Sequence, residues 1–355
     1  EIGVRLVGSE MCIRDRTNNG NVVGAVGFNL DTTEFIVIRA KEVVLAMNEF
    51  NPSCRDMFYC PATGYAAAYE AGAQLRNVEH LTEWDLCYRN TGNFLYGVHW
   101  VVSNQKGENI FRKYNCTSLE ELEVNLIRGM EKELEMGNGP LVADFTQLQQ
   151  ANEGADGFFH GIEMKRRLEL DEFIRHYQNI DLSNPKPEVS VSYRVSIRSL
   201  RIDVEGKTTV PHLWGIGQMT TAGSAHGSWV HGDGLGVAAK TGLMTARALA
   251  KRIDDSELGE IDEDQIERFR KRIYESAEYS GEYRPDHVIR YLSRLIKRPE
   301  YSYYKTEETM TELLAELEDV RSKYKDLIHL PKVNGHYLSK AIELRTLSLI
   351  HISEP

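Results

Sequence analysis

A glycine-rich segment near residue 215 has the residue types best suited to hold a cofactor. The sequence "VPHLWGIGQ" (210–218) begins as an apolar strand and ends in Gly-x-Gly-Gln, and eight glycines fall between Gly215 and Gly242. A glycine backbone has no Cβ, so it can approach a flat or anionic ligand closely. The plainer alternative is a tight corner between a strand and a helix, where glycine is needed only for steric reasons.

Histidines and arginines are the candidates for contact with a substrate. His226, inside the glycine-rich segment, is the first choice for a group beside a cofactor, and His231 is the second choice and a possible proton donor. Arg194, Arg198 and Arg201 alternate in "YRVSIRSLR", which we expect to be one strand. Arginine binds carboxylate and sulfate groups through its two-pronged guanidinium. The plainer alternatives are a histidine that caps a carbonyl and a solvated strand edge.

Three further side chains have two possible roles each. Arg128 lies on a predicted helix where it can bind an anion, or pair with neighbouring glutamates at the surface. Trp100 can stack on a cofactor ring, or simply fill the core. Asp233 is expected to form a turn or cap a helix rather than to catalyse. The sequence has no metal-ligand spacing and no nucleophile motif of a hydrolase.

The composition is that of a soluble globular protein with several domains. The chain has 355 residues, of which 41% are hydrophobic and 27% charged, and its net charge is −11. This acidic balance argues against a nucleic-acid binder, which needs basic side chains to neutralise phosphates. Five scattered cysteines without a C-x-x-C pair fit a reducing compartment, so we expect a cytoplasmic protein. No apolar run approaches the roughly 18 residues of a membrane-spanning helix.

The elements that position these residues follow from periodicity and from turn residues. Two β-rich runs joined by "DTTE" (31–34) predict a hairpin, and "VVLAM" (43–47) resembles a strand buried on both faces. An alanine-rich helix is expected to end near Gly72. Further predictions are short strands over 80–115 and 189–204, and helices over 117–140, 154–177, from 234, 263–280 and 306–327.

Both ends of the chain look foreign to the rest. "GSEMCIRDR" (8–16) has neither helical nor strand periodicity, and "LSLIHISEP" (347–355) is an apolar patch that follows a charged helical region. We expect residues 1–16 and 347–355 to be non-native tags, although a frayed natural terminus is the alternative.

Three motifs in order resemble a known family. "TTVPHLWGIGQ" resembles the second cofactor motif of two-dinucleotide-type flavoproteins, and "EFIVIRAKEVVLAM" resembles their strand that returns to the flavin. "TGYAAAYEAGAQLRNVE" resembles the segment that follows that strand. Over residues 17–250 the chain is similar to the fumarate reductase/succinate dehydrogenase flavoprotein family. Short matches at 24–28, 137–140, 224–226 and 237–240 resemble the branch of the adenylylsulfate reductase α-subunit.

The resemblance implies an α/β fold and an FAD-dependent oxidoreductase. It implies a two-dinucleotide-type FAD-binding domain in two pieces (17–80 and 187–252), an inserted mixed α+β cap domain (81–186) and a C-terminal helical region (253–346). The reaction would move two electrons, as a hydride, between flavin and a small anionic substrate, with a possible iron–sulfur subunit as electron partner. The chain would not span a membrane.

The resemblance also implies which residues surround the flavin. His226 with Arg194 or Arg128, and then His231, would face the substrate. The residues expected to line FAD are Ala46, Gly64, Trp100, Gly215, Gly217, Gln218, Gly232, Gly234, Leu235 and Gly236.

The sequence departs from the family pattern at several positions. Val230 replaces the arginine that clamps a carboxylate, no histidine stands near 84–86, and the cap-helix arginine would fall near Glu123. Gln218 replaces the usual acid, and the G-x-G-x-x-G that cradles the FAD pyrophosphate is absent. The first three departures argue against dicarboxylate reduction, and without the G-x-G-x-x-G this chain alone is expected to bind FAD weakly. They keep two alternatives open: a catalytically inactive flavoprotein-like assembly partner, and a nucleotide- or sugar-binding module without flavin.

Overall fold

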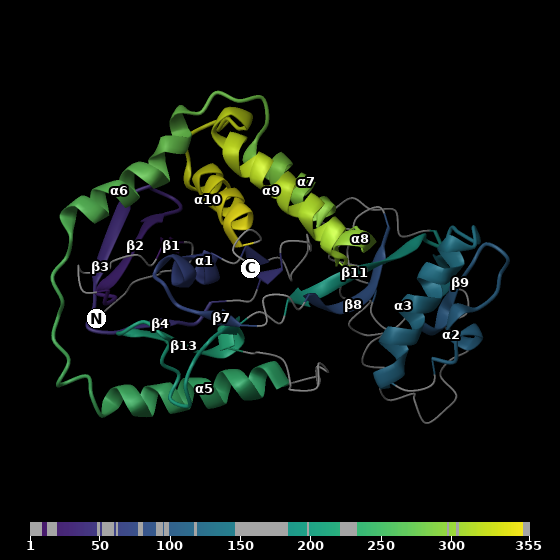
Figure 1. Ribbon diagram of the computed structural model, residues 1–355, viewed down its shortest axis with the longest axis horizontal. Helices are drawn as coiled ribbons and strands as arrows, with labels where there is room; N and C mark the ends of the chain where they lie inside the picture. Colours follow the sequence, from purple (N-terminus) through teal and green to yellow (C-terminus); the bar gives the residue numbers. More distant parts are fainter. Residues whose placement is uncertain are drawn as a thin grey trace. The chain divides into compact units, whose positions relative to one another are not determined.

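The chain folds into two compact units (Figure 1). Unit 1 comprises Glu1–Pro52, Tyr59–Leu81 and Val195–Pro355, and unit 2 comprises Ser53–Phe58 and Thr82–Arg194. The computed structural model describes residues 9–12, 20–47, 50–51, 60–61, 63–76, 81–89, 95, 99–116, 119–145, 184–196, 199–220, 233–296, 298–302 and 305–350.

The predicted hairpin is confirmed in unit 1. Strands β2 (Gly24–Asn29) and β3 (Phe35–Arg39) pair antiparallel, and the Asn29 side chain accepts hydrogen bonds from two backbone amides of the turn. Strand β1 (Ser9–Cys12) pairs antiparallel with β2, so the expectation that residues 8–16 lack strand structure is wrong. The edge of β2 offers hydrogen bonds to a neighbouring segment. Such pairing can hold a segment extended even when its sequence lacks an alternating pattern.

A parallel strand pair joins two distant parts of unit 1. Strand β4 (Val43–Leu45) pairs with β13 (Leu213–Gly215), and Val43 lies opposite Leu213. The prediction that 43–47 is buried on both faces is wrong, since Leu45 is buried whereas Val44 is 38% exposed. Among the described strands, β4 pairs with β13 alone, and a strand covered on both faces needs more neighbours.

The alanine-rich helix ends where the sequence predicts. Helix α1 (Thr63–Glu70) is followed by Gly72, which adopts φ of 87°. The amide of Ala73 donates to the carbonyl of Ala68, a glycine-terminated helix cap. Unit 1 also contains two short antiparallel pairs. Before the helix, β5 (Phe50–Asn51) pairs with β6 (Cys60–Pro61). After it, β7 (Leu75–Arg76) pairs with the distant β12 (Ser199–Leu200).

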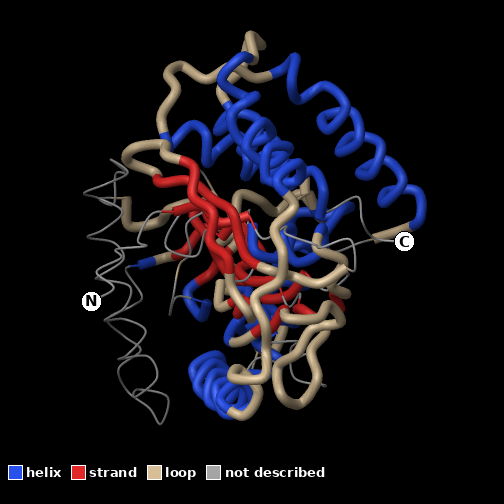
Figure 2. The backbone as a smooth tube through the Cα atoms, turned by 90° about the vertical axis from the view of Figure 1, so that its left-hand side faces the viewer, coloured by secondary structure: helices blue, strands red, loops and turns tan. Residues whose placement is uncertain are grey.

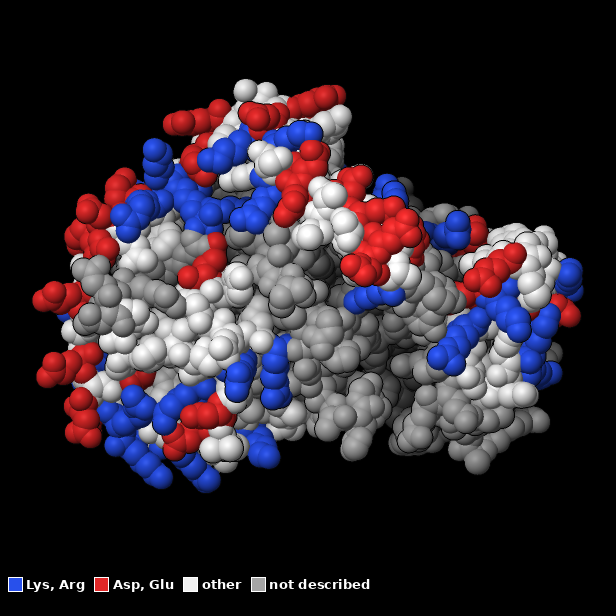
Figure 3. Space-filling model, in the orientation of Figure 1, with Lys and Arg blue, Asp and Glu red and all other residues white. Residues whose placement is uncertain are grey.

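Helices make up the rest of unit 1. Asp262 caps α6 through the amide of Gln265, and Thr306 caps α9 through the amide of Thr309, which confirms both predicted helix starts. Figures 1 and 2 show the strands of this unit between α5 on one side and the C-terminal helices on the other. Charged side chains cover the outer surfaces of these helices (Figure 3). The helices are α5 (Asp233–Ala250), α6 (Glu263–Tyr274), α7 (Pro285–Leu295), α8 (Pro299–Ser302), α9 (Glu307–Leu327) and α10 (Gly335–Ile350).

The hairpin packs its buried face against the helices. Val26 contacts Ile266 and Phe269 of α6, and Phe28 packs with Ile273 and Leu338. Removing such apolar side chains from water drives this packing. The last turn of α10 belongs to the segment 347–355 that was expected to be a tag, and Leu347 in it is buried. A buried apolar side chain continues the core face of the helix, so this part of the segment is not an unrelated patch.

Unit 2 has its own apolar core and a mixture of short strands and helices. Its elements are β8 (Leu81–Tyr88), the 3₁₀ helix η1 (His99–Val101), β9 (Val102–Ser103), α2 (Ile110–Lys113), α3 (Leu119–Glu135), β10 (Val142–Ala143) and β11 (Val189–Ser196). Strand β8 pairs with β11, and β9 with β10. These elements confirm the short strands predicted over 80–115 and the helix predicted over 117–140. The helix predicted over 154–177 lies outside the described residues.

Two kinds of feature are absent from the described residues. No helix in them combines the length and the apolar character that crossing a membrane requires. Nor do the described histidine, cysteine, aspartate and glutamate side chains form a group of three able to hold a metal ion.

Candidate functional site

The ends of β4 and β13 bring two of the predicted cofactor motifs together. The two strands run parallel, and the amide of Ile216 donates to the carbonyl of Leu45 over 2.9 Å. In open α/β sheets, ligands bind beyond the carboxyl ends of parallel strands. Ala46, exposed at the end of β4, and the Gly-x-Gly turn at the end of β13 therefore share one such edge.

The turn after β13 is fixed by a threonine from α5. Gly217 has φ of 66°, a left-handed conformation that favours glycine, and its amide donates to Thr241 Oγ1 over 2.9 Å. Thr241 in turn donates to the carbonyl of Val237 at 2.7 Å, while Thr220 Oγ1 donates to the carbonyl of Gly217 at 2.8 Å. Neither threonine was predicted to belong to the site, because only the fold brings Thr241 to this turn.

Helix α1 carries the third motif to the same place. The Tyr65 hydroxyl donates to the carbonyl of Gln218 over 3.3 Å. A Cβ added to Gly64 would lie 2.6 Å from Met47 Sδ and 3.1 Å from Met219 Cε. At Gly64, α1 therefore packs closely against Met47 and Met219, which follow β4 and β13. Three motifs from distant parts of the sequence converge at one edge.

The glycines of the site do not share one role. A Cβ at Gly215 would lie 3.0 Å from Leu200 Cδ1, so packing alone explains this buried glycine. At Gly217 the nearest atom to an added Cβ would be Ala238 Cβ at 3.8 Å, and at Gly236 no described atom lies within 4 Å. Packing thus fits Gly215 and the left-handed backbone explains Gly217, whereas Gly236 has open space beside its backbone.

The first turn of α5 is the part of the site with the most exposed apolar surface. The flavin-lining loop was expected to include 232–236, but α5 begins at Asp233, so Gly234, Leu235 and Gly236 are helical. The helix therefore begins inside the glycine-rich segment, where alanine and other small residues alternate with the glycines. Leu235 is 81% exposed. The backbone amides of a first helical turn carry partial positive charge and attract anions.

A buried carboxylate anchors the two strands behind this edge. Glu42 is 3% exposed and accepts from Trp214 Nε1 at 2.6 Å and from Ser256 Oγ at 3.0 Å. His212 Nδ1 lies 3.2 Å away from it, and Arg252 contacts both Glu42 and the face of the indole. The sequence analysis did not single out Glu42. The sequence feature that points to Glu42 is a carboxylate placed directly before an apolar strand.

The remaining predicted site residues belong to unit 2 or lie outside the described residues. His226, His231 and Gly232 lie outside the described residues. Arg128 is exposed on α3, and Arg194 lies in β11. Trp100 lies in η1, packed against the core of unit 2, which matches the plainer alternative for its side chain.

The expectation that Arg194, Arg198 and Arg201 share one strand is wrong. Strand β11 ends at Ser196, and Arg201 follows a separate strand, β12. The compact units divide between Arg194 and Val195, and the Arg201 guanidinium donates to Gln74 Oε1 at 2.8 Å. Alternation of side chains is a local pattern, and it does not show where a chain leaves one sheet for another.

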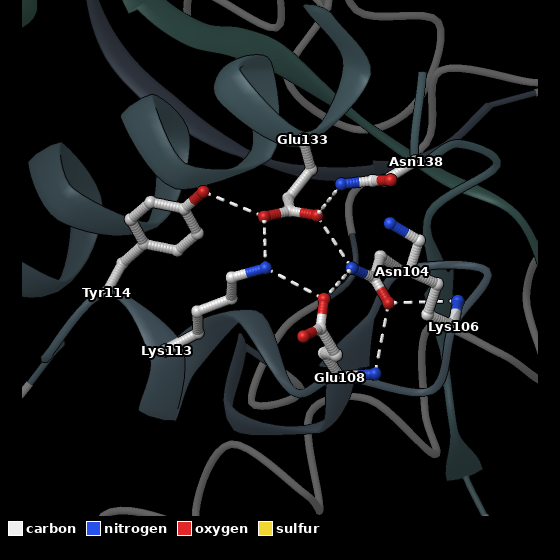
Figure 4. A network of polar contacts seen from close by, with 7 residues as sticks. All are labelled: Asn104, Lys106, Glu108, Lys113, Tyr114, Glu133 and Asn138. Carbon is white, nitrogen blue, oxygen red and sulfur yellow. Dashed lines mark hydrogen bonds and ion pairs between the residues drawn. The ribbon is translucent and has the colours of Figure 1, made fainter. Parts of the chain in front are cut away.

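Unit 2 contains a separate polar centre around Glu133 (Figure 4). Its buried carboxylate accepts from Asn104 at 2.6 Å, from Asn138 at 2.8 Å and from the Tyr114 hydroxyl at 2.8 Å. Lys113 Nζ lies 2.9 Å from the same carboxylate. Asn104 and Asn138 belong to loops on either side of α3, so this carboxylate ties those loops to the helix.

The hydrogen bonds of this centre set its charge state. Burial alone would raise the pKa of Glu133, but the hydrogen bonds from Lys113, Asn104, Tyr114 and Asn138 together lower it to about 2. A hydrogen bond to Glu108, followed by the one to Glu133, raises the pKa of Lys113. Every oxygen of the Glu133 carboxylate is occupied within the protein. The centre is therefore suited to holding loops rather than to proton transfer.

Comparison with known proteins gave matches in structure but not in sequence. No family model matches the chain. No curated protein matches it either.

Several solved structures have a similar fold. A quinol–fumarate reductase with menaquinol molecules superposes with a TM-score of 0.75 at 15% identity, over 97% of this chain and 63% of that one. Adenylylsulfate reductase from Archaeoglobus fulgidus gives 0.66 at 19% identity, over 97% and 64%. Mycobacterium smegmatis Sdh1 in complex with UQ1 gives 0.71 at 17% identity, over 97% and 58%.

These matches bear on the fold. The chain spans less than two thirds of the length of each of these structures. Fumarate reductase and adenylylsulfate reductase are the proteins that the sequence motifs pointed to, and the expected resemblance is confirmed at the level of fold. The chain has a mixed helix-and-strand fold similar to that of the fumarate reductase and adenylylsulfate reductase structures.

Proposed function

We propose that this chain is part of an FAD-dependent oxidoreductase that moves two electrons between flavin and a small anionic substrate. The observation that carries the proposal is the convergence of three sequence motifs at the ends of β4, β13 and the start of α1. The fold shared with fumarate and adenylylsulfate reductases supports it.

The residues present fit a flat, partly anionic cofactor. Gly236 has open space beside its backbone, and the exposed first turn of α5 offers amides to a carbonyl or a phosphate. Gln218 would hydrogen-bond a ribityl hydroxyl, and Ala46 and Gly64 would border the same edge. When bound, FAD would supply the acceptor and donor of the hydride. The chain's own residues would bind it, orient it and keep water away from it.

The domain assignment is part of the proposal. In it, residues 17–80 and 187–252 form a two-dinucleotide-type FAD-binding domain, 81–186 form a cap, and 253–346 form a helical region. His226 and His231, with Arg194 or Arg128, would face the substrate. An iron–sulfur subunit would be the electron partner, and the protein would work in the cytoplasm. The five cysteines without a C-x-x-C pair fit a reducing compartment.

A pair of matched glycine variants tests flavin binding. Gly236→Leu would fill the open space on the first turn of α5, while Gly242→Leu adds the same side chain to the same helix six residues later, also in open space. We expect Gly236→Leu to weaken FAD binding by about tenfold or more, equivalent to losing about 1.4 kcal/mol. Gly242→Leu should bind FAD like the parent chain. Titration with FAD, followed by quenching of flavin fluorescence, measures both.

The outcome separates the proposal from its alternatives. Equal FAD affinity in the two variants would refute the assignment of the site at α5. Failure of the parent chain to bind FAD would favour a module without flavin. Bound FAD that transfers no electrons to any tested carboxylate or sulfur oxyanion would favour an assembly subunit, as the replacement of a family arginine by Val230 suggests.

A further inference from the structure

A cavity in the helical part of unit 1 is lined almost entirely by cationic side chains. It has a volume of about 410 Å³, within the usual range of small-molecule sites of roughly 300–1,000 Å³. We call it the basic cavity. Its lining residues are Arg268, Lys271, Arg272, Glu275, Arg321, Tyr324, Lys325 and Arg345.

Two helices contribute side chains at matching spacing. Arg268, Lys271 and Arg272 lie at i, i+3 and i+4 in α6, so they share one face of that helix. Arg321, Tyr324 and Lys325 repeat this spacing in α9, and Arg345 comes from α10. Figure 3 shows blue side chains gathered over the region where α6 and α9 end in Figure 1. The helix dipole also favours cations in the last turn of a helix. Arg268 and Arg345 do not lie in last turns, so the dipole does not explain their presence.

The positive charge of the basic cavity is balanced only in part. Lys325 Nζ lies 3.0 Å from Glu275, Arg272 lies 2.6 Å from Glu70, and Arg268 lies 3.9 Å from Asp262. Within the described part of the chain, Lys271 and Arg321 make no ion pair. Six cations against one carboxylate in a single lining contrast with the net charge of −11 for the whole chain. Such concentrated charge repels itself and attracts anions.

The basic cavity shares three lining residues with a second space that has more apolar walls. Arg272, Tyr324 and Arg345 also border a narrower space of about 50 Å³, lined by Ala66, Phe269 and other buried side chains. The Arg272 side chain is 24% exposed. Apolar walls lower the local dielectric, and charge attraction is stronger there than at an open surface.

We propose that the basic cavity binds a small molecule with two or more phosphate groups, of which inorganic pyrophosphate is the simplest. The planar fork of arginine matches the geometry of a phosphate group, and lysine adds a point charge. Cations supplied by α6, α9 and α10 can contact more than one phosphate at once. This site lies apart from the edge at β4 and β13, and it does not depend on flavin.

A charge-matched pair of double variants tests the proposal. Lys271→Gln with Arg321→Gln removes one lysine and one arginine from the lining, one each from α6 and α9. Arg270→Gln with Lys323→Gln removes the same charges from the same helices, at positions that do not line the cavity. Titration calorimetry with pyrophosphate at fixed ionic strength measures the affinity. Circular dichroism checks that all three chains are folded.

We expect the lining variant to bind pyrophosphate about 100-fold more weakly, since each lost charge-assisted hydrogen bond costs about tenfold. The control variant should bind like the parent chain. An equal loss in both variants, or no loss in either, would overturn the proposal. So would orthophosphate binding as tightly as pyrophosphate. Tighter binding of a polyglutamate peptide would overturn it too, in favour of an acidic protein partner.

Discussion

The indole Nε1 of Trp214 donates a hydrogen bond to Glu42 over 2.6 Å, and both side chains are buried. Trp214 lies in β13, and Glu42 lies directly before β4. The bond therefore ties together two strands that are 170 residues apart in the chain and pair in parallel. The turn that carries Gly217 follows one of these strands, so its position depends on this anchor.

Trp214→Phe should destabilise unit 1. The variant keeps an aromatic ring but removes part of the buried indole and its donor, which leaves a buried carboxylate with one hydrogen bond fewer. We expect the free energy of unfolding to fall by about 2 kcal/mol, a typical cost for a hydrogen bond to a charged group. Denaturant unfolding measures it. Tyr291→Phe removes a donor to Glu316 at an exposed site, and should cost less than about 0.5 kcal/mol. Similar losses in the two variants would contradict the anchor.

Glu133→Gln should destabilise unit 2 in a pH-dependent way. The lowered pKa of Glu133 means that the folded state favours the charged carboxylate. Its stabilisation is present above the ordinary value of 4.5 and is lost as the pH falls toward about 2. Near neutral pH we expect a loss of about 3 kcal/mol, because the amide cannot accept all four hydrogen bonds.

The difference between parent and Glu133→Gln should shrink as the pH falls from 4.5 toward about 2. Denaturant unfolding across this range checks it. Glu135→Gln, on the exposed face of the same helix, is the control and should have little effect. A difference that is constant with pH would contradict the assigned charge state.

Thr241→Val should weaken FAD binding more than it weakens the fold. The variant removes the acceptor that holds the amide of Gly217, and the turn loses its fixed position. We expect FAD affinity to fall about tenfold, with about 1 kcal/mol lost in stability. Thr311→Val in α9 removes a similar hydrogen bond, from its hydroxyl to the carbonyl four residues before, without touching the turn. Unchanged FAD affinity in Thr241→Val would show that this turn does not contribute to FAD binding.

Gly335→Ala should break the contact between α10 and the hairpin. A Cβ at this position would lie 1.9 Å from the carbonyl oxygen of Leu30, so backbone must move. We expect a loss of about 3 kcal/mol, in the range of overpacked sites. Thermal unfolding measures it. Gly242→Ala, which meets no described atom, should be neutral or slightly stabilising. A parent-like melting temperature for Gly335→Ala would show that the contact is not close.

The sequence by itself determined the local elements. Turn residues predicted the hairpin between β2 and β3, Gly72 marked the end of α1, and amphipathic periodicity predicted α6 and α9. Each of these depends on interactions within a few residues, and capping and turn preferences are properties of neighbouring side chains and backbone. The order of the three motifs also predicted the fold.

Only the tertiary structure decided which distant segments meet. Periodicity gave the charged faces of α6 and α9, but not that they line one cavity with Arg345. It suggested one strand for Arg194 and Arg201, which fall in different compact units. Nor did it show that Thr241 holds Gly217, or that Glu42 is buried beneath Trp214. A periodic pattern specifies which face an element buries, whereas its partner is chosen by packing and hydrogen bonding across the whole chain.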